Sequence, residues 1–275
     1  MTPADRGLRR ILVALDASRA SLEALEAGAA IASRSGAELE ALFVEDIDLL
    51  RAAGLPCGLQ ISMPSGTARP LDRRSMESEL RAVAARAREA VESAARASGI
   101  ASSFRVARGR VAVEVLGAAR NADLLVLGRV SRRIGSGPGA TARAAARESS
   151  TPVLVMGREA EIEPPLLVAY DGSPEADRAL DLAARLSGDA AGGLVLLLVA
   201  GREEDARGLA ERARQRLALP TPPRSRWIGG GWEGLVAAAR GARSPLVLSG
   251  RSPALPEILI EGLLDELEAA VLVVR

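Results

Sequence analysis

The sequence has no histidine and no lysine, so all 36 of its basic residues are arginines, and it has a single cysteine, Cys57. Without histidine there is no Ser-His-Asp triad and no HExxH metal site. Without lysine there is no P-loop lysine and no Schiff base. A single cysteine excludes an internal disulfide and a cysteine-based zinc site. We therefore expect no metal site, and Asp, Glu, Ser, Thr, Tyr170, Cys57 and Arg are the side chains left for chemistry.

An excess of one charge is missing too, because the 36 basic residues face 35 acidic ones. The formal charge of +1 gives no basic field, so we expect no nucleic-acid partner. Long apolar runs are also missing: the longest uncharged one covers residues 190–201, well below the roughly 18–20 residues of a membrane-spanning helix. We expect no membrane partner and a cytoplasmic location, which suits a lone reduced thiol.

The sequence does contain one pattern written twice. Short runs of Leu, Val and Ile alternate with longer segments of helical periodicity, which is typical of buried parallel strands and the helices that cover them. The runs lie at residues 11–15, 39–44, 104–107, 124–127, 152–156, 166–170, 194–199, 225–228, 245–248 and 271–274. Asp16 recurs as Asp171, and Gly128 recurs as Gly250. This repeat predicts two Rossmann-like α/β units, each a doubly wound, five-stranded parallel sheet with helices on both faces.

A chain of 275 residues is long enough for two domains. The boundary is expected within residues 157–165, which contain charges, a glycine and a proline pair, and this gives domains of residues 1–158 and 165–275. The first domain is longer because of an insert at about residues 46–72. The insert is rich in proline and contains Cys57, and we expect it to be a loop or an irregular segment.

In an open α/β sheet, ligands bind beyond the carboxyl ends of the strands, where the strand order reverses. This rule places Asp16, Val44 and the segment from Gly128 to Thr141 around one crevice. The segment has four glycines and three arginines and leads into a helix, a combination that suits phosphate. The alternative interpretations are a solvated surface loop and, for Ser18 and Ser173, simple capping of a helix.

The order of ILVALDAS, LFVED, ADLLVLGR, a glycine-rich loop and STPVLVM resembles the universal stress protein family. The second half carries LLVAYDGSPEADRALDLAARL, which resembles the opening of the same family. The resemblance covers both halves and implies a tandem form with strand order 3-2-1-4-5 in each sheet. It also implies that the last strands of the two halves pair with each other, and it leaves a higher oligomer open.

ATP-binding members of the family carry Gly-x2-Gly-x9-Gly-Ser/Thr after the fourth strand. Here Gly128 and Gly139 match the first and third glycines, Ser131 stands at the second, and the loop is two residues short. The resemblance therefore implies a degenerate adenine-nucleotide site, for ATP or AMP, in the first half. Its candidate residues are Ala14, Asp16, Val44, Gly128, Ser131, Gly137, Gly139 and Thr141.

The second half lacks the phosphate motif, since Glu257 and Ile258 stand where Gly-Ser is expected. A carboxylate there repels phosphate, so we expect no nucleotide in the second half and a structural role for Asp171 and Ser173, such as pairing with the first half. Trp227 and Trp232 either stack on a ligand or are simply buried.

Two functions remain after these arguments. The first is a stress-response regulator with a nucleotide site in the first half and no enzymatic activity, although slow ATP hydrolysis stays open. The alternative is a nucleotide-free module that has lost both phosphate loops and binds an unidentified protein partner. Related nucleotidyl transferases need a histidine motif and related ATP pyrophosphatases need a Ser-Gly-Gly-x-Asp-Ser loop, and the sequence has neither.

Overall fold

The computed structural model describes residues 7–55, 59–61, 68–70, 72–129, 139–157, 162–188, 192–219, 221–229, 231–240, 242–253 and 258–275. Cys57, Ser131, Gly137 and Glu257 lie outside these ranges. We use "first half" for the chain up to residue 157 and "second half" for residues 162–275. The domain bounds at residues 158 and 165 stay a prediction.

The first half contains, in chain order, β1 (Arg10–Leu15), α1 (Arg19–Ser35), β2 (Glu38–Asp46), α2 (Ile47–Ala52), β3 (Leu59–Ile61), β4 (Ala68–Pro70), α3 (Arg73–Ser98), β5 (Ser102–Gly109), α4 (Val111–Ala119), β6 (Leu124–Leu127), α5 (Ala140–Glu148) and β7 (Val153–Val155). The second half contains β8 (Leu166–Tyr170), α6 (Pro174–Ser187), β9 (Leu194–Val199), α7 (Glu203–Leu217), β10 (Arg224–Ile228), α8 (Gly231–Ala239), β11 (Leu246–Ser249), α9 (Ile258–Glu266) and β12 (Val271–Val274).

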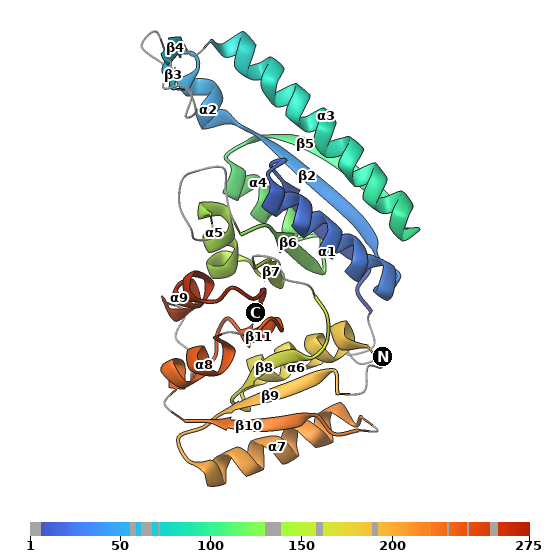
Figure 1. Cartoon of the computed structure of the whole chain (residues 1–275), viewed down its shortest axis with the longest axis vertical. Helices are drawn as coiled ribbons and strands as arrows, with labels where there is room; N and C mark the ends of the chain where they lie inside the picture. The colour runs from blue at the N-terminus through green and yellow to red at the C-terminus, as the bar shows by residue number, and fades with distance from the viewer. Residues whose placement is uncertain are drawn as a thin grey trace.

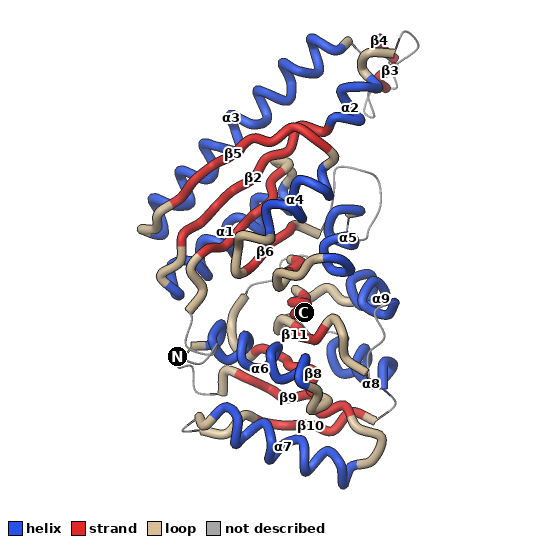
Figure 2. Tube along the Cα trace, turned by 180° about the vertical axis from the view of Figure 1, so that it is seen from behind, coloured by secondary structure: helices blue, strands red, loops and turns tan. Residues whose placement is uncertain are grey.

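The main sheet has ten strands in the order β10-β9-β8-β11-β12-β7-β6-β1-β2-β5. Each half contributes five parallel strands to this sheet. Counted among these five alone, without β3 and β4 of the first half, the strands follow the expected order 3-2-1-4-5. The halves meet where β7 pairs antiparallel with β12, with Leu154 opposite Leu272. The expected pairing of the last strands is therefore confirmed, and it joins the two sheets into a single one that runs along the long axis of the molecule (Figures 1 and 2).

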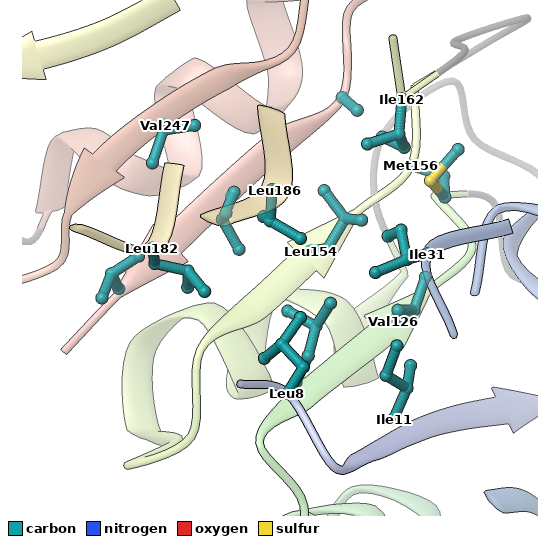
Figure 3. Packing of buried hydrophobic residues seen from close by; sticks show 14 of the residues in the cluster. Leu8, Ile11, Ile31, Val126, Leu154, Met156, Ile162, Leu182, Leu186 and Val247 are labelled. Carbon is teal, nitrogen blue, oxygen red and sulfur yellow. The ribbon is translucent and has the colours of Figure 1, made fainter. Parts of the chain in front are cut away.

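Alternation along the strands sends side chains to both faces of the sheet. Ile11 and Val13 belong to one apolar cluster, with residues of α1, α3, α6 and α7, while Leu12 belongs to a second cluster with residues of α4, α5, α8 and α9. Both clusters contain residues of both halves. Figure 3 shows the first cluster crossing the seam at Leu154. The core on each face is thus continuous across the β7–β12 pair.

Local signals set the helix ends. Ser18 caps the start of α1. The helix ends before Gly36, whose φ of 66° is the left-handed conformation that glycine adopts at little cost. The long helix α3 begins after Asp72, whose carboxylate accepts a hydrogen bond from the Ser75 amide, and ends before Gly99 at φ 64°. Among the described residues, no helix is both long enough and apolar enough to cross a membrane.

The insert at about residues 46–72 is more ordered than we expected, and the prediction of a loop was wrong. It contains α2 and a small antiparallel hairpin of β3 and β4, in which Leu59 pairs with Pro70. Asp46 caps α2, and Leu50 packs against Met76 of α3. A six-residue helix and two three-residue strands are too short to give a period in the sequence, so the prolines dominated the pattern.

Candidate functional site

A cavity of about 890 Å³ lies at the carboxyl ends of β1, β2 and β6. Six of the eight residues proposed from the sequence line it: Ala14, Asp16, Val44, Gly128, Gly139 and Thr141. Ser131 and Gly137 lie outside the described residues. The fold thus brings together residues that are up to 127 positions apart in the sequence. Their role in binding a ligand stays a prediction.

One wall of the cavity is apolar. Leu42 and Val44 of β2 and Val115 of α4 line it, together with Ala14 and Leu127 from neighbouring strands. These residues belong to, or pack against, the cluster on the α4–α5 face of the sheet. An apolar wall of this kind suits an aromatic ring system.

Asp16 follows β1 directly and also lines the cavity. Its Oδ1 accepts a hydrogen bond from the Ser18 amide at 2.9 Å, and the intervening Ala17 has a φ of 55°. Ser18 in turn accepts from the Ser21 amide at 3.2 Å. The capping interpretation of Ser18 is therefore confirmed. Asp16 is held by the same turn and still lines the cavity.

Gly128 has a packing reason of its own. A Cβ at this position would lie 2.6 Å from the carbonyl carbon and oxygen of Ala20 and 2.8 Å from the Ser21 amide nitrogen. Such distances are well below van der Waals contact, so only glycine fits against the first turn of α1. The glycine at the start of the loop is required by the fold, whether or not phosphate binds there.

The first turn of α5 opens onto the cavity. Gly139 is the N-cap and offers no side-chain hydrogen bond, and the first turn has no acidic residue. The residues from Gly139 to Arg143 line the cavity. The Gly139 amide donates to the carbonyl oxygen of Arg129 at 2.9 Å, which ties together the two ends of the intervening loop. An uncapped helix start concentrates partial positive charge and favours an anion.

Arg129 corrects one expectation for the loop. This side chain is only 6% exposed and enters the second half, where it donates to the carbonyl oxygens of Asp265, at 3.1 Å, and Leu267. These carbonyls lie at the end of α9, where a cation is favoured. Arg129 therefore joins the two halves and is not directed to phosphate. Arg132 and Arg133 lie outside the described residues.

The sequence analysis missed Arg143. It lies in the first turn of α5 and lines the cavity, and its guanidinium contacts Asp265 at 2.6 Å and Glu261 at 3.6 Å, both on α9. A basic residue four positions after the last loop glycine was the available signal. The insert was also missed as part of the wall: Asp48 and Leu49 of α2 line the cavity, and Asp48 contacts Arg110 at 3.5 Å.

Asp171, the counterpart of Asp16 in the second half, is hydrogen-bonded to protein groups. Asp171 Oδ1 accepts hydrogen bonds from the amide of Ser173 at 2.9 Å and from its hydroxyl at 2.6 Å, and Oδ2 accepts from the hydroxyl of Ser252. Ser252 belongs to the segment that follows β11, so this segment is bonded directly to the aspartate. These contacts give Asp171 and Ser173 the structural role that we expected, although the partners lie in their own half rather than in the first.

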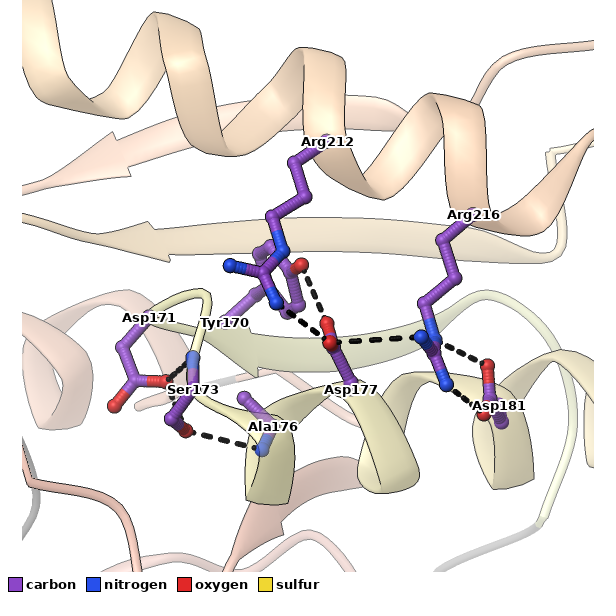
Figure 4. A network of polar contacts seen from close by, with 8 residues as sticks. All are labelled: Tyr170, Asp171, Ser173, Ala176, Asp177, Asp181, Arg212 and Arg216. Atoms are coloured by element: carbon purple, nitrogen blue, oxygen red, sulfur yellow. Dashed lines mark hydrogen bonds and ion pairs between the residues drawn. The ribbon is translucent and has the colours of Figure 1, made fainter.

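A polar network in the second half is centred on the buried side chains of Tyr170 and Asp177 (Figure 4). The hydroxyl of the fully buried Tyr170 donates to Asp177 at 2.7 Å, and Arg212 of α7 donates to the other oxygen of Asp177 at 2.8 Å. Burial, followed by the hydrogen bond to Asp177, raises the pKa of Tyr170 well above its ordinary value. The position of Tyr170 in the repeat corresponds to Leu15, which lines the cavity of the first half.

The two tryptophans differ in their surroundings. Trp232 packs against the apolar cluster and against Gly262, where a Cβ would lie 3.2 Å from the indole ring. Trp227 is 40% exposed on the edge strand β10 and donates through Nε1 to the carbonyl of Ala200 at 3.0 Å. Among the described residues, no three His, Cys, Asp or Glu side chains are grouped to hold a metal ion.

Comparison with known proteins points to one family. Residues 7–56 match the model of the universal stress protein family. The whole fold is similar to a universal stress protein from Archaeoglobus fulgidus, with a TM-score of 0.70 and 18% identity over 97% of this chain and 98% of that one. A putative universal stress protein from Pseudomonas aeruginosa has a TM-score of 0.57 and 18% identity, covering 97% and 93%.

A functionally unknown protein from Pseudomonas aeruginosa has a TM-score of 0.56 and 16% identity, with coverage of 97% of this chain and 92% of that one. At these identities the likeness establishes the fold. No curated protein matches the sequence. The family match confirms the resemblance over residues 7–56, which contain the first strand, the first helix and the second strand. For the rest of the chain the comparisons show the fold.

Proposed function

Because residues 7–56 match the universal stress protein family and the chain has the family's fold throughout, we propose that this protein is a stress-response regulator that binds one adenine nucleotide, ATP or AMP. The nucleotide would occupy the cavity of the first half. The observation that carries the proposal is that six residues, selected from the sequence alone, line a single cavity.

The chemistry of the cavity suits this ligand. Its volume of about 890 Å³ is within the usual range for a small-molecule site. The apolar wall at Val44 and Val115 would take the adenine ring, and the carboxylate of Asp16 would accept a hydrogen bond from the ribose or from the adenine amino group. The uncapped start of α5 would face the phosphates. We propose no catalytic role for any of these groups.

The second half would bind no nucleotide. Asp171 is hydrogen-bonded to Ser252, which lies in the segment that corresponds to the phosphate loop. The contacts of α9 with Arg129 and Arg143 favour a role in supporting the first half. One chain would therefore bind one nucleotide.

A specific observation favours the second candidate, a nucleotide-free module that binds a protein partner. Arg129, the first arginine of the loop, is committed to the carbonyls of α9, and Asp46 and Asp48 add negative charge to the cavity wall. Both features lower the affinity for phosphate. With this second function, the cavity would be a feature of the fold that binds no nucleotide.

Nucleotide-dependent thermal unfolding distinguishes the two candidates. A ligand at about 100 times its dissociation constant adds roughly 2.7 kcal/mol to the free energy of unfolding. At about 2–4 °C per kcal/mol for a chain of this size, the midpoint should rise by several degrees with ATP or AMP. Titration calorimetry should give one nucleotide per chain. No shift with ATP, AMP or adenosine would overturn the nucleotide proposal and leave the interaction module.

The repeat supplies a matched control. Asp16→Ala should abolish the nucleotide-induced shift, whereas Asp171→Ala, the same substitution at the equivalent position of the second half, should retain it. Each shift is measured against the midpoint of the same variant without ligand, because both substitutions remove a turn hydrogen bond. If the nucleotide-induced rise of the midpoint is lost only in Asp171→Ala, the nucleotide binds in the second half, which contradicts the proposal.

A further inference from the structure

Arg143 connects the cavity of the first half to the second half. It lines the cavity from the first turn of α5, and its guanidinium contacts two carboxylates of α9, Asp265 at 2.6 Å and Glu261 at 3.6 Å. The side chains are 31% exposed for Arg143, 45% for Asp265 and 36% for Glu261, so none of them is locked in the core. An arginine in this setting can exchange one anionic partner for another.

Two other basic side chains of the described residues lie near the cavity, and neither belongs to the first turn of α5. Arg129 is buried and donates to the carbonyls at the end of α9. Arg110 lies across the cavity, on the α4 side, and contacts Asp48 of the insert at 3.5 Å. Among the described residues, Arg143 is the basic side chain in the first turn of α5, whose amides have no side-chain cap.

The chemistry of the guanidinium decides what would displace the carboxylates. Its planar fork binds phosphate and carboxylate in the same geometry. A phosphate has more charge and more acceptor oxygens than either carboxylate, and at the start of α5 it would also meet the backbone amides. A phosphate bound there would therefore compete with the α9 carboxylates for the guanidinium of Arg143.

We infer that Arg143 binds the phosphates of the nucleotide and that Asp265 and Glu261 lower the nucleotide affinity by competing for it. This inference rests on the proposed function of the first half. It assigns the second half a role at the site: α9 sets how strongly the first half discriminates between a nucleotide and its nucleoside. By linkage, a bound polyphosphate loosens the ion pairs between α5 and α9 to the same degree.

The size of the effect follows from the exposure of the pair. Ion pairs between half-exposed side chains change an equilibrium by about two- to five-fold. Removing Asp265 should therefore raise the affinity for ATP by about two- to five-fold. Removing Arg143 should lower the affinity for ATP by about ten-fold, because hydrogen bonds to charged groups are the stronger ones. Adenosine, which has no phosphate, should bind all variants equally.

The experiment is titration calorimetry of the full-length chain with ATP and with adenosine. The variants are Arg143→Gln, Asp265→Asn and the double substitution, with Glu266→Gln as the control. Glu266 is the neighbour of Asp265 on α9 and contacts Arg240 of the second half at 2.6 Å. Its substitution changes the net charge equally without touching Arg143. We expect Asp265→Asn to strengthen ATP binding in the wild-type background and to have no effect once Arg143 is replaced.

The outcomes separate this inference from the proposed function. If wild type binds neither ATP nor adenosine, the proposed function fails and the inference fails with it. If wild type binds ATP, Asp16→Ala abolishes the binding and Arg143→Gln leaves the ATP affinity unchanged, the site is correct and the inference is overturned. If Asp265→Asn and Glu266→Gln raise the ATP affinity equally, the effect is general charge repulsion, and the competition for Arg143 is overturned.

Discussion

Gly157 lies directly against the backbone of Glu268, so closely that a Cβ on Gly157 would overlap the carbonyl oxygen of Glu268. Gly157 is the second residue after β7, and Glu268 lies three residues before β12, the strand that pairs with β7. The contact therefore lies at the seam between the halves. It forms because antiparallel pairing brings the exit of one strand to the entry of the other.

Gly157→Ala should weaken this seam. The added methyl group has no room, so β7 and β12 must shift, at a cost of roughly 2–3 kcal/mol in the free energy of unfolding. The midpoint of thermal unfolding should fall by about 4–12 °C. Gly117→Ala on α4 is the control, because nothing lies within 4 Å of the position of its Cβ. Equal stability of the two variants would contradict the close approach at the seam.

Gly128→Ala tests whether the first glycine of the loop serves packing. The new Cβ would lie 2.6 Å from the Ala20 carbonyl, so we expect a loss of about 1–3 kcal/mol in urea unfolding without any nucleotide. Gly208→Ala, in the middle of α7 and open to solvent, should instead be neutral or gain up to about 1 kcal/mol. A stable Gly128→Ala variant would leave ligand binding as the sole reason for this glycine.

The fold could be predicted because each half repeats strong local signals. The strands expected over residues 124–127, 166–170, 194–199 and 271–274 match the structure to the residue, since a continuous apolar run marks their ends. The hairpin of the insert could not be predicted in the same way. Its strands have three residues each, and pairing between them leaves no periodicity in the sequence.

The candidate site could be predicted in part. Asp16, Val44 and Gly128 follow the carboxyl ends of parallel strands, where ligands bind to such sheets, whereas Gly139 came from the resemblance to the family's glycine motif. The hydrogen-bond partners of Arg129 could not be predicted from its position in the loop, because they lie 136 and 138 residues later in the sequence. The contribution of Arg143 depends in the same way on α9, which the sequence places in the other half.

Asp72 should make the stability of α3 depend on acid pH. Its hydrogen bonds with Ser75, first to the amide at 2.8 Å, lower the pKa of the carboxyl in the folded chain. A lowered pKa gives a contribution that is present above the unfolded value of about 3.9 and is lost as the pH falls through the folded value. Asp72→Asn retains a capping side chain without the titration. Its free energy of unfolding should fall less steeply than that of wild type below about pH 4, and identical slopes would contradict the assignment.

Tyr170 should produce the opposite dependence, at alkaline pH. Because burial and the bond to Asp177 raise its pKa in the folded chain, the phenol stays neutral there, while in the unfolded chain it ionises at about pH 10. The stabilisation is complete below about pH 10 and is lost as the pH rises towards the folded value. The slope should approach about 1.4 kcal/mol per pH unit.

The sequence makes this measurement unambiguous, because Tyr170 is the only tyrosine. The ultraviolet absorbance of tyrosinate should therefore appear together with unfolding and not before it. Tyr170→Phe should remove the extra alkaline slope and cost about 1–2 kcal/mol at neutral pH, since Asp177 loses a buried donor but retains Arg212. Tyrosinate absorbance that develops near pH 10 while the chain remains folded, at roughly the ordinary pKa of tyrosine, would show that the hydroxyl is neither buried nor hydrogen-bonded to Asp177 in solution.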